Sequence, residues 1–570
     1  MKKIFAILII CASLNVSAQF INPLFIAPTM TGDTFNLNIQ NGTTQFYTGI
    51  NTPTFGINGN ILAPTLIVNK WEWVTMNVTN SLTGSGNSST IHWHGLHVPA
   101  KYDGGPHQVI AQGTTWSPHF QILNTAGTFW YHPHGDNQTD RQVSKGIAGM
   151  IIVKDSVEAA LTLPRNYGVD DFPIIVQSKA FDVLNQIAIS TEEDTAVCVN
   201  ATMHPYLNAP AQVIRLRFLN GSSMRTYNFG FTGNHPFKMI AGDGGLLDSA
   251  ITLTRIMLSP GERAEILLDL QGEQGDTIFL NSFSSEMANG IYGASTVTGM
   301  MGATITDYNL NPLNGADFGI LQLNVVAQTG GAITTLPTAL TTNSPLTSFS
   351  VSRNFTLAPV TMSPSTMLIG PFDINNASFD MNVINETVYL NAVEKWRVTN
   401  NTSIAHPFHI HDVEFYILNV NGGAVPNYEQ GKKDVVFVMP QQYVEFVTKF
   451  EDFADDSIPY MYHCHLLHHE DDGMMGSFRV IDTTGTGIAD ISESSGIKIF
   501  PNPATNEFKI KSLKLKGGVL KIYNVLGEMV YELLISKEET TIDVSFLNEG
   551  IYFVQVKTGN GIYNRKIIKE

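Results

Sequence analysis

The sequence predicts an all-β protein made of several stacked β-sandwich domains, and three observations support this fold class. Short runs rich in Val, Ile, Thr, Tyr and Phe alternate with clusters of Gly, Pro, Asn and Asp, whereas convincing amphipathic helices are few. Two segments in opposite halves of the chain repeat one another. A chain of 570 residues is also too long for one hydrophobic core, because domains hold roughly 100–200 residues. The expected strands include 66–78, 149–154, 213–219, 264–270, 443–450 and 476–481.

The composition is that of an ordinary folded protein and excludes several classes. With 43% hydrophobic and 15% charged residues, the chain is neither a largely disordered protein nor a coiled coil. Its net charge of −17 argues against nucleic acid as a partner, because phosphate binding needs a basic surface. The unusual feature is a set of 16 histidines beside only 3 cysteines, which points to metal chemistry rather than to disulfides.

The first 18 residues have the plan of a secretory signal peptide. Two lysines precede an apolar run at 4–14, and Val16-Ser17-Ala18 offers the small residues of a cleavage site. A membrane anchor is the alternative, but that run is shorter than the roughly 20 residues that a spanning helix needs. We therefore expect an exported protein, secreted or attached to the cell surface, which passes through the periplasm. Removal of the signal also removes Cys11 and leaves Cys198 and Cys464.

The internal repeat divides the chain into domains. Trp73–Asn80 and Trp396–Asn401 each precede a histidine cluster, and each unit then continues to a Tyr-His-X-His motif. Between them, segments 214–221 and 259–269 are typical of the same kind of domain without the histidines. We therefore predict three sandwiches, with the following boundaries: 19–155, 156–327 and 350–482, with linkers at 328–349 and 483–496.

A shift in composition marks a fourth unit at 497–570. It holds 11 Lys and Arg against 8 Asp and Glu, whereas the chain before it is strongly acidic. Its Pro501-Asn502-Pro503 motif, its strand 550–554 and its basic end resemble the C-terminal sorting domain of type IX secretion cargo, a small β-sandwich. The resemblance implies the type IX secretion machinery as a partner. A generic accessory or carbohydrate-binding module is the alternative.

Ten of the sixteen histidines fall in four clusters. In a strand, His-X-His places both imidazoles on the same face, about 7 Å apart along the backbone. Four such clusters in step with a domain repeat indicate one shared site, which requires the first and third domains to meet. The ten are His92, His94, His132, His134, His406, His409, His411, His463, His465 and His469.

The last cluster indicates which metal is bound. If 460–466 is a strand, His463 and His465 point one way and Cys464 points the other way. A thiolate with two imidazoles and a weak thioether forms a blue copper site, and Cys464 and Met474 supply the two sulfurs. Structural zinc, the rival, usually takes four strong ligands. Cys464 is then joined through one residue on either side to imidazoles that face a second metal site.

With these motifs in place, residues 30–482 resemble the multicopper oxidases, specifically the three-domain bacterial type that includes laccases and cuprous oxidases. The resemblance implies three cupredoxin-like Greek-key sandwiches and four copper ions. The family's spacings, five and ten residues after the cysteine, select His469 over His468 and Met474 over Met475. Position by position, it assigns the type 1 copper to His406, Cys464, His469 and Met474, the type 2 copper to His92 and His409, and the two type 3 coppers to His94, His132, His134, His411, His463 and His465.

The resemblance also implies a mechanism. A reducing substrate gives single electrons to the type 1 copper, and these cross through Cys464 to His463 and His465 and on to the three-copper cluster, where dioxygen becomes water. The four protons that this needs call for nearby acids. Asp103 and Glu470 match carboxylates to which the family assigns that role, and a solvated loop acid is the alternative for each.

The substrate is the open question. The methionine-rich insert of cuprous oxidases is short here, since only Met362 and Met367 correspond to it, so we expect a monomeric laccase-like oxidase of phenols or aromatic amines. A Cu(I) or Fe(II) oxidase, a copper-sequestering surface protein and a copper nitrite reductase are the alternatives, and the full type 3 set argues against the last. Other methionines that could hold cuprous ions are Met287, Met300, Met301 and Met381, and the histidines without a partner at ligand spacing are His97, His107, His119, His204, His235 and His468.

Overall fold

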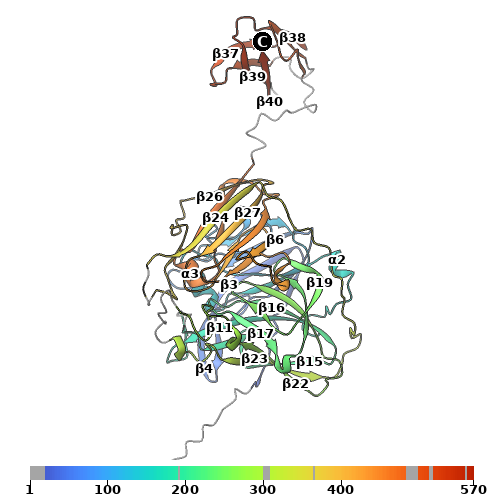
Figure 1. Cartoon of the computed structure of the whole chain (residues 1–570), viewed down its shortest axis with the longest axis vertical. Helices are drawn as coiled ribbons and strands as arrows, with labels where there is room; N and C mark the ends of the chain where they lie inside the picture. The colour runs from blue at the N-terminus through green and yellow to red at the C-terminus, as the bar shows by residue number, and fades with distance from the viewer. Residues whose placement is uncertain are drawn as a thin grey trace, which may run out of the picture. The chain divides into compact units, whose positions relative to one another are not determined.

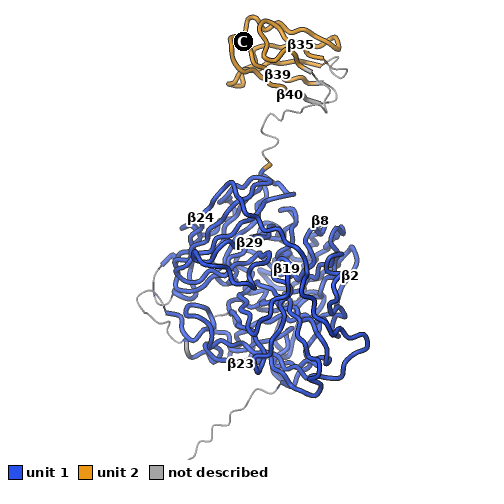
Figure 2. Tube along the Cα trace, turned by 45° about the vertical axis from the view of Figure 1, so that its right-hand side comes forward, with its two compact units in different colours: residues 1–481 blue, residues 482–570 orange. Residues whose placement is uncertain are grey.

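The computed structural model places the chain in two compact units, residues 1–481 and 482–570 (Figures 1 and 2). It describes residues 20–189, 193–298, 308–361, 363, 366–482, 498–511, 518–558 and 561–570. The predicted signal peptide and the predicted linker 483–496 lie outside the described residues, as do Met300, Met301 and Met362. Strands dominate both units and the helices are short, so the predicted all-β sandwich class is confirmed. No helix in the described part of the chain is long and apolar enough to cross a membrane.

The first sandwich joins two sheets around a core to which both contribute, including Phe35, Val74, Trp93 and Phe129. Alternate residues of its strands face this core, as in β6, where every second side chain is buried. One sheet has the order β2 (Thr29–Thr31), β5 (Thr65–Asn69), β10 (Gly149–Lys154), β9 (Gly127–Tyr131). The other has the order β4 (Ile50–Ile57), β3 (Thr34–Tyr47), β6 (Trp73–Asn80), β7 (Thr115–Trp116), with β8 (His119–Gln121) also beside β6.

The middle sandwich has two long central strands, β11 and β16, that are almost wholly enclosed. One sheet runs β14 (Thr202–Met203), β13 (Ala196–Val199), β11 (Asp171–Phe181), β16 (Val213–Asn220), β21 (Arg263–Asp269), β18 (Phe237–Gly242), β19 (Gly245–Leu253), with β12 (Ile187–Ala188) beside β11. The other runs β1 (Asn22–Pro23), β15 (Pro205–Pro210), β23 (Asp317–Val326), β22 (Thr277–Phe283), β17 (Tyr227–Phe231), β20 (Ile256–Leu258).

The third sandwich repeats the plan of the first and carries most of the metal-binding candidates. Its core holds Trp396 and Phe446 together with Cys464 and Met474. One sheet has the order β25 (Phe372–Ile374), β24 (Val351–Pro359), β27 (Val393–Asn400), β31 (Tyr443–Lys449), β29 (Phe415–Val420), and Figure 1 shows β24 and β27 side by side. The other has the order β26 (Glu386–Tyr389), β33 (Met475–Ile481), β32 (Asp455–Cys464), β28 (His406–Ile410), β30 (Val435–Val438).

The described part of the first unit holds three short α-helices: α1 (Thr139–Ser144), α2 (Ser156–Ala159) and α3 (Leu467–Asp471). The second unit is a separate small sandwich whose two sheets share a core that includes Phe508, Leu520 and Val554. Its sheets are β34 (Lys498–Phe500), β35 (Glu507–Lys511), β38 (Glu539–Asp543), and β37 (Met529–Leu534), β36 (Val519–Tyr523), β39 (Gly550–Thr558), β40 (Gly561–Lys569).

A buried asparagine ends one strand in each sandwich of the first unit. The last residues of β6, β16 and β27 are Asn80, Asn220 and Asn400. The side-chain Nδ2 of each asparagine donates to two backbone carbonyls. Each Oδ1 accepts the backbone N–H two residues further on. When the two repeats are aligned on these asparagine corners, the tryptophans that the sequence pattern matched do not coincide. Trp396 is buried and lies four residues before Asn400, whereas Trp73 lies seven residues before Asn80 and is 55% exposed.

Candidate metal centre

His132, His134, His411 and His465 lie just beyond the ends of strands, whereas His406 and His409 lie within β28 and His463 is the next-to-last residue of β32. β9 ends at Tyr131, and His92 and His132 pair only as an isolated bridge. The strand predicted at 460–466 ends at Cys464, because the chain bends there and enters α3. His463 and His465 nevertheless lie on one side, with ring centroids 5.5 Å apart. At a strand end the side chains extend beyond the sheet, so imidazoles from the first and third sandwiches can meet.

Six histidines form two groups of three, each drawing on both sandwiches. In one group, His132 Nε2 and His465 Nε2 lie 3.4 and 3.2 Å from His94 Nδ1. In the other, His134 Nε2 and His411 Nε2 lie 3.1 and 3.2 Å from His463 Nε2. Ring nitrogens this close, all from buried side chains, present a cluster of ligand atoms to a shared cation in each group.

Two further imidazoles, His92 and His409, point free nitrogens at the same region. Their Nδ1 atoms donate to the backbone carbonyls of Asp103 and Asp434, at 2.9 and 2.8 Å. Their Nε2 atoms are buried and have no hydrogen-bond partner. A buried polar atom without a partner is costly, and a bound metal ion removes that cost.

The sulfur-containing group lies in the core of the third sandwich. Cys464 Sγ is 3.3 Å from His406 Nδ1 and 3.7 Å from His469 Nδ1. The outer nitrogens of these rings are held by Thr402 Oγ1 (2.8 Å) and the Leu368 carbonyl (2.9 Å). Met474 is fully buried in the same core, and its carbonyl accepts the Cys464 N–H at 3.0 Å. One thiol and two Nδ1 atoms thus meet in an apolar setting, and Met474 lies in the same core, so the residues present form a donor set that suits copper.

Burial determines the protonation of these groups. Desolvation lowers the pKa of His463 and of His469 to about 3, and it lowers the pKa of seven more well below the usual value: His94, His132, His134, His406, His409, His411 and His465. These nine imidazoles are therefore neutral, the form that binds metal. The same burial raises the pKa of the Cys464 thiol, so a bound cation is needed to hold it as thiolate.

Asp103 and Glu470, which the sequence predicted, each contact two clustered histidines at Nδ1, the nitrogen that faces away from the cluster. Asp103 Oδ2 is 2.7 Å from His411 Nδ1, and its Oδ1 is 3.4 Å from His92 Nδ1. Glu470 reaches Nδ1 of His134 and of His463, each at 3.3 Å. Burial, followed by the neighbouring Asp471, raises the pKa of Glu470 well above its usual value. The structure therefore brings together every titratable residue predicted for the site.

Sequence reasoning missed Asp434 and Arg263. Asp434 Oδ1 lies 3.2 Å from His94 Nε2, and the Arg263 guanidinium binds both carboxylate oxygens at 2.6 and 2.5 Å. Gly95 makes room for this pair, because a Cβ there would lie 2.4 Å from Asp434, and Gly261 makes room for a clustered histidine, because a Cβ there would lie 2.9 Å from His465. The signal in the sequence was an acid, Asp434, directly before the apolar strand 435–438, but no motif linked it to a histidine.

The six remaining histidines belong to none of the groups of converging ligand atoms among the described residues. His97 contacts Asp412 and Asp452, and His235 contacts Glu273. His107 faces the Met381 carbonyl, and His119 stacks on Trp73. Met287 packs against Ile291 and Ala405, and Cys198 is a buried free thiol.

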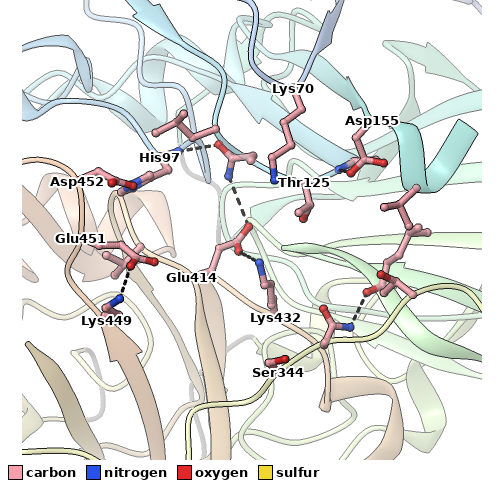
Figure 3. A pocket seen from close by; sticks show the side chains of 18 of the residues that line it. Lys70, His97, Thr125, Asp155, Ser344, Glu414, Lys432, Lys449, Glu451 and Asp452 are labelled. Atoms are coloured by element: carbon pink, nitrogen blue, oxygen red, sulfur yellow. Dashed lines mark hydrogen bonds and ion pairs between the residues drawn. The ribbon is translucent and has the colours of Figure 1, made fainter. Parts of the chain in front are cut away.

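A cleft of about 890 Å³ opens beside this region (Figure 3). Its wall carries the ion pairs Lys432–Glu414 and Lys449–Glu451, and His97 stands between Asp452 at the rim and the buried Asp412. Asp412 directly follows His411, and Asn124 in the cleft wall donates to the carbonyl of Gly95, which follows His94. The cleft therefore ends beside the chain segments that carry two of the clustered histidines.

Comparison with known proteins identifies this arrangement. Family models described as multicopper oxidase match residues 20–158, 186–300 and 345–484. A curated relative, multicopper oxidase mco of Staphylococcus haemolyticus, is 34% identical over 458 residues, which cover 78% of this chain and 88% of that protein. The chain belongs to the multicopper oxidase family.

Solved structures agree with this multicopper oxidase assignment. A bacterial laccase-like multi-copper oxidase, CueO of Ochrobactrum sp., is 30% identical with a TM-score of 0.71, over 80% of this chain and 100% of that one. A relative of a different name, cell division protein FtsP of Sodalis glossinidius, is 32% identical over 79% of this chain and 89% of its own length. Family membership implies copper, dioxygen and a reducing substrate, but the FtsP similarity means that the reaction must be argued from the site.

The tail is identified separately. Residues 498–570 match a secretion system C-terminal sorting domain, so the predicted resemblance is confirmed and the unit indicates export or attachment to the cell surface.

Proposed function

We propose that this multicopper oxidase removes single electrons from phenols or aromatic amines and passes them to dioxygen. Four donors each lose one electron, and dioxygen takes up the four electrons and four protons to give two molecules of water. Bound copper ions would supply the one-electron redox chemistry and the site of dioxygen reduction. The donor set supports copper, because thiol, thioether and imidazole ligands all suit it and two buried Nε2 atoms otherwise lack partners.

The ligand assignment that we propose for four copper ions follows the groups described above. The sulfur-containing group would hold the type 1 ion, the free Nε2 atoms of His92 and His409 would hold the type 2 ion, and the two three-histidine groups would hold the type 3 pair. The first group is His94, His132 and His465, and the second is His134, His411 and His463.

The observation that carries the proposal is the link through Cys464. Its thiol faces His406 and His469, while the adjacent residues His463 and His465 each belong to a different three-histidine group. One peptide bond on each side of Cys464 therefore joins the proposed electron-accepting site to the site where dioxygen would react. A protein that only stored copper would have no need of such a connection.

Asp103 and Glu470 are the proposed proton-handling groups. Each carboxylate lies beside Nδ1 of two cluster histidines, on the side opposite the metal-facing nitrogens. At these positions Asp103 can accept or release a proton beside Nδ1 of His411 or His92, and Glu470 can do the same beside Nδ1 of His134 or His463. Neither carboxylate competes for the nitrogens that would bind metal.

Oxygen uptake by the copper-loaded full chain tests the proposal. The donors are a phenol, an aromatic diamine, Cu(I), Fe(II) and Mn(II), each with Cys464→Ser as the matched blank. We expect uptake that depends on the phenol or diamine. Turnover with only Cu(I) or Fe(II) would favour a metal oxidase, and four bound coppers with no turnover would favour a sequestering protein. The chain is proposed to act as a monomer at or outside the cell surface, after signal-peptide removal and sorting through its C-terminal unit.

A further inference from the structure

We propose that Asp434, fixed by Arg263, is a positioning residue that sets which nitrogen of His94 faces the metal. The inference rests on the proposed function for the identity of the metal. It begins from an asymmetry among the eight clustered imidazoles that lie outside the sulfur-containing group. Of these eight, His94 alone directs Nδ1 at its partners, whereas the other seven direct Nε2 inward.

The environment of His94 explains the asymmetry. Its Nε2 lies 3.2 Å from Asp434 Oδ1, so the N–H that a neutral imidazole must carry is donated there and Nδ1 is left with its lone pair. Elsewhere the outward nitrogen is Nδ1, as in His92 and His409, where it donates to a backbone carbonyl. The carboxylate thus selects both the ring orientation and the tautomer of His94.

Arg263 holds that carboxylate in place. Its guanidinium binds both Asp434 oxygens in a fork, and its own backbone N–H donates to Asp243 at 2.8 Å. Arg263 and Asp434 are both fully buried, so the pair cannot swing into solvent. The glycine at Gly95 is required here, because any side chain would collide with Asp434 and Arg263.

The pair also connects all three sandwiches at the metal groups. His94 comes from the first, Arg263 from β21 of the middle one, and Asp434 from the residue before β30 of the third. The Asp434 carbonyl additionally accepts from His409 Nδ1 at 2.8 Å, so one residue orients a histidine in two different groups. The middle sandwich, which has no clustered histidine, would act on the copper cluster through this arginine.

The test compares Asp434→Asn with Glu262→Gln. Glu262 is a suitable control because it is equally enclosed, pairs with the buried Lys433 at 2.8 Å and has no histidine contact among the described residues. We expect Asp434→Asn to keep the blue absorption of the Cys464 site but to hold the other copper ions about 10- to 100-fold more weakly, as outer-shell changes do. Its non-blue copper EPR signal should shift, and Glu262→Gln should match wild type in both.

A copper-free readout separates this inference from the proposed function. In ¹⁵N-histidine-labelled protein without metal, His94, assigned by comparison with His94→Gln, should carry its proton on Nε2 in wild type and lose that preference in Asp434→Asn. Unchanged tautomer, copper retention and EPR in Asp434→Asn would overturn the proposal, as would equal losses in Glu262→Gln. If Asp434→Asn also loses the blue absorption, Arg263→Lys becomes the deciding variant: selective loss of non-blue copper supports positioning, and any other result rejects it. Four bound coppers without oxygen uptake in wild type would sink only the proposed function.

Discussion

The three sandwiches of the first unit share one corner but differ in what lies beside it. Asn80 and Asn400 are each followed within twelve residues by clustered histidines, whereas Asn220 is followed by none. The middle sandwich instead buries charge: Glu265 pairs with Arg215 and Arg217, and Arg217 also binds Asp171 at 2.7 Å. The difference indicates that the asparagine at the strand end has a structural role in all three sandwiches. The first and third sandwiches add metal-binding histidines after it, and the middle sandwich adds none.

The largest expected effect distinguishes the two cysteines. Cys464→Ser removes the thiolate of the proposed type 1 site, so the blue absorption should vanish and oxygen uptake should fall about 10³-fold or more, because the site works as a unit. Cys198→Ser, in the middle sandwich, should keep both. Absorption spectra and oxygen uptake check this pair, and a blue Cys464→Ser protein would contradict the electron path.

The buried charge of the middle sandwich should dominate stability. Burial alone would raise the pKa of Glu265, but Arg215 and Arg217 outweigh it and lower the pKa to about 2. Its stabilisation is thus present above the unfolded value near 4.5 and is lost as pH falls through about 2. Glu265→Gln should cost about 3–5 kcal/mol in the free energy of unfolding at pH 7 and less in acid. Denaturant titrations of wild type and Glu265→Gln at pH 7 and at an acidic pH test this. An equal loss in the free energy of unfolding at every pH would count against the prediction.

The asparagine corners offer a smaller and more discriminating test. Asn220→Ala and Asn400→Ala should each cost about 2 kcal/mol, because backbone groups lose buried hydrogen bonds. Only Asn400→Ala should alter the blue absorption, since Asn400 orients Thr402 and Thr402 Oγ1 contacts His406. If Asn220→Ala changes the spectrum equally, the corner is not merely a scaffold.

The smallest effect concerns His97 at the cleft. Burial alone would lower its pKa, but Asp412 and Asp452 outweigh it and raise the pKa to about 9. Burial also raises the pKa of Asp412 to about 6, so the stabilisation is present between that value and 9 and is lost as pH rises through 9. Because Asp452 is 56% exposed, we expect about 1 kcal/mol at most. The melting temperatures of wild type and His97→Gln should converge above pH 9; a constant gap would refute the assignment.

Much of this site could be predicted because its signals are local. The spacing of His469 and Met474 after Cys464 is set within one bend and one short helix. Strand 149–154 was predicted with its observed bounds, whereas the run 66–78 divides into β5 and β6 around Trp71, which adopts a positive φ of 73°. That conformation depends on partners such as the Ile122 carbonyl, which pattern reasoning does not see.

The missed residues are those whose role exists only in three dimensions. Arg263 and Asp434 are separated by 171 residues, and neither belongs to a spaced motif. A carboxylate before a buried strand is also common where no metal is bound, so its meaning depends on the arginine that faces it. The histidine clusters were visible because each carries several ligands in one stretch of chain.

The separation of ligands along the chain has a consequence for assembly. His94 and His465 lie 371 residues apart yet share one group, and the other histidine groups outside the sulfur-containing site also unite the first and third sandwiches. A growing chain cannot assemble these groups until both sandwiches have folded against each other. Copper loading of these groups thus becomes a late event, one that can follow translocation.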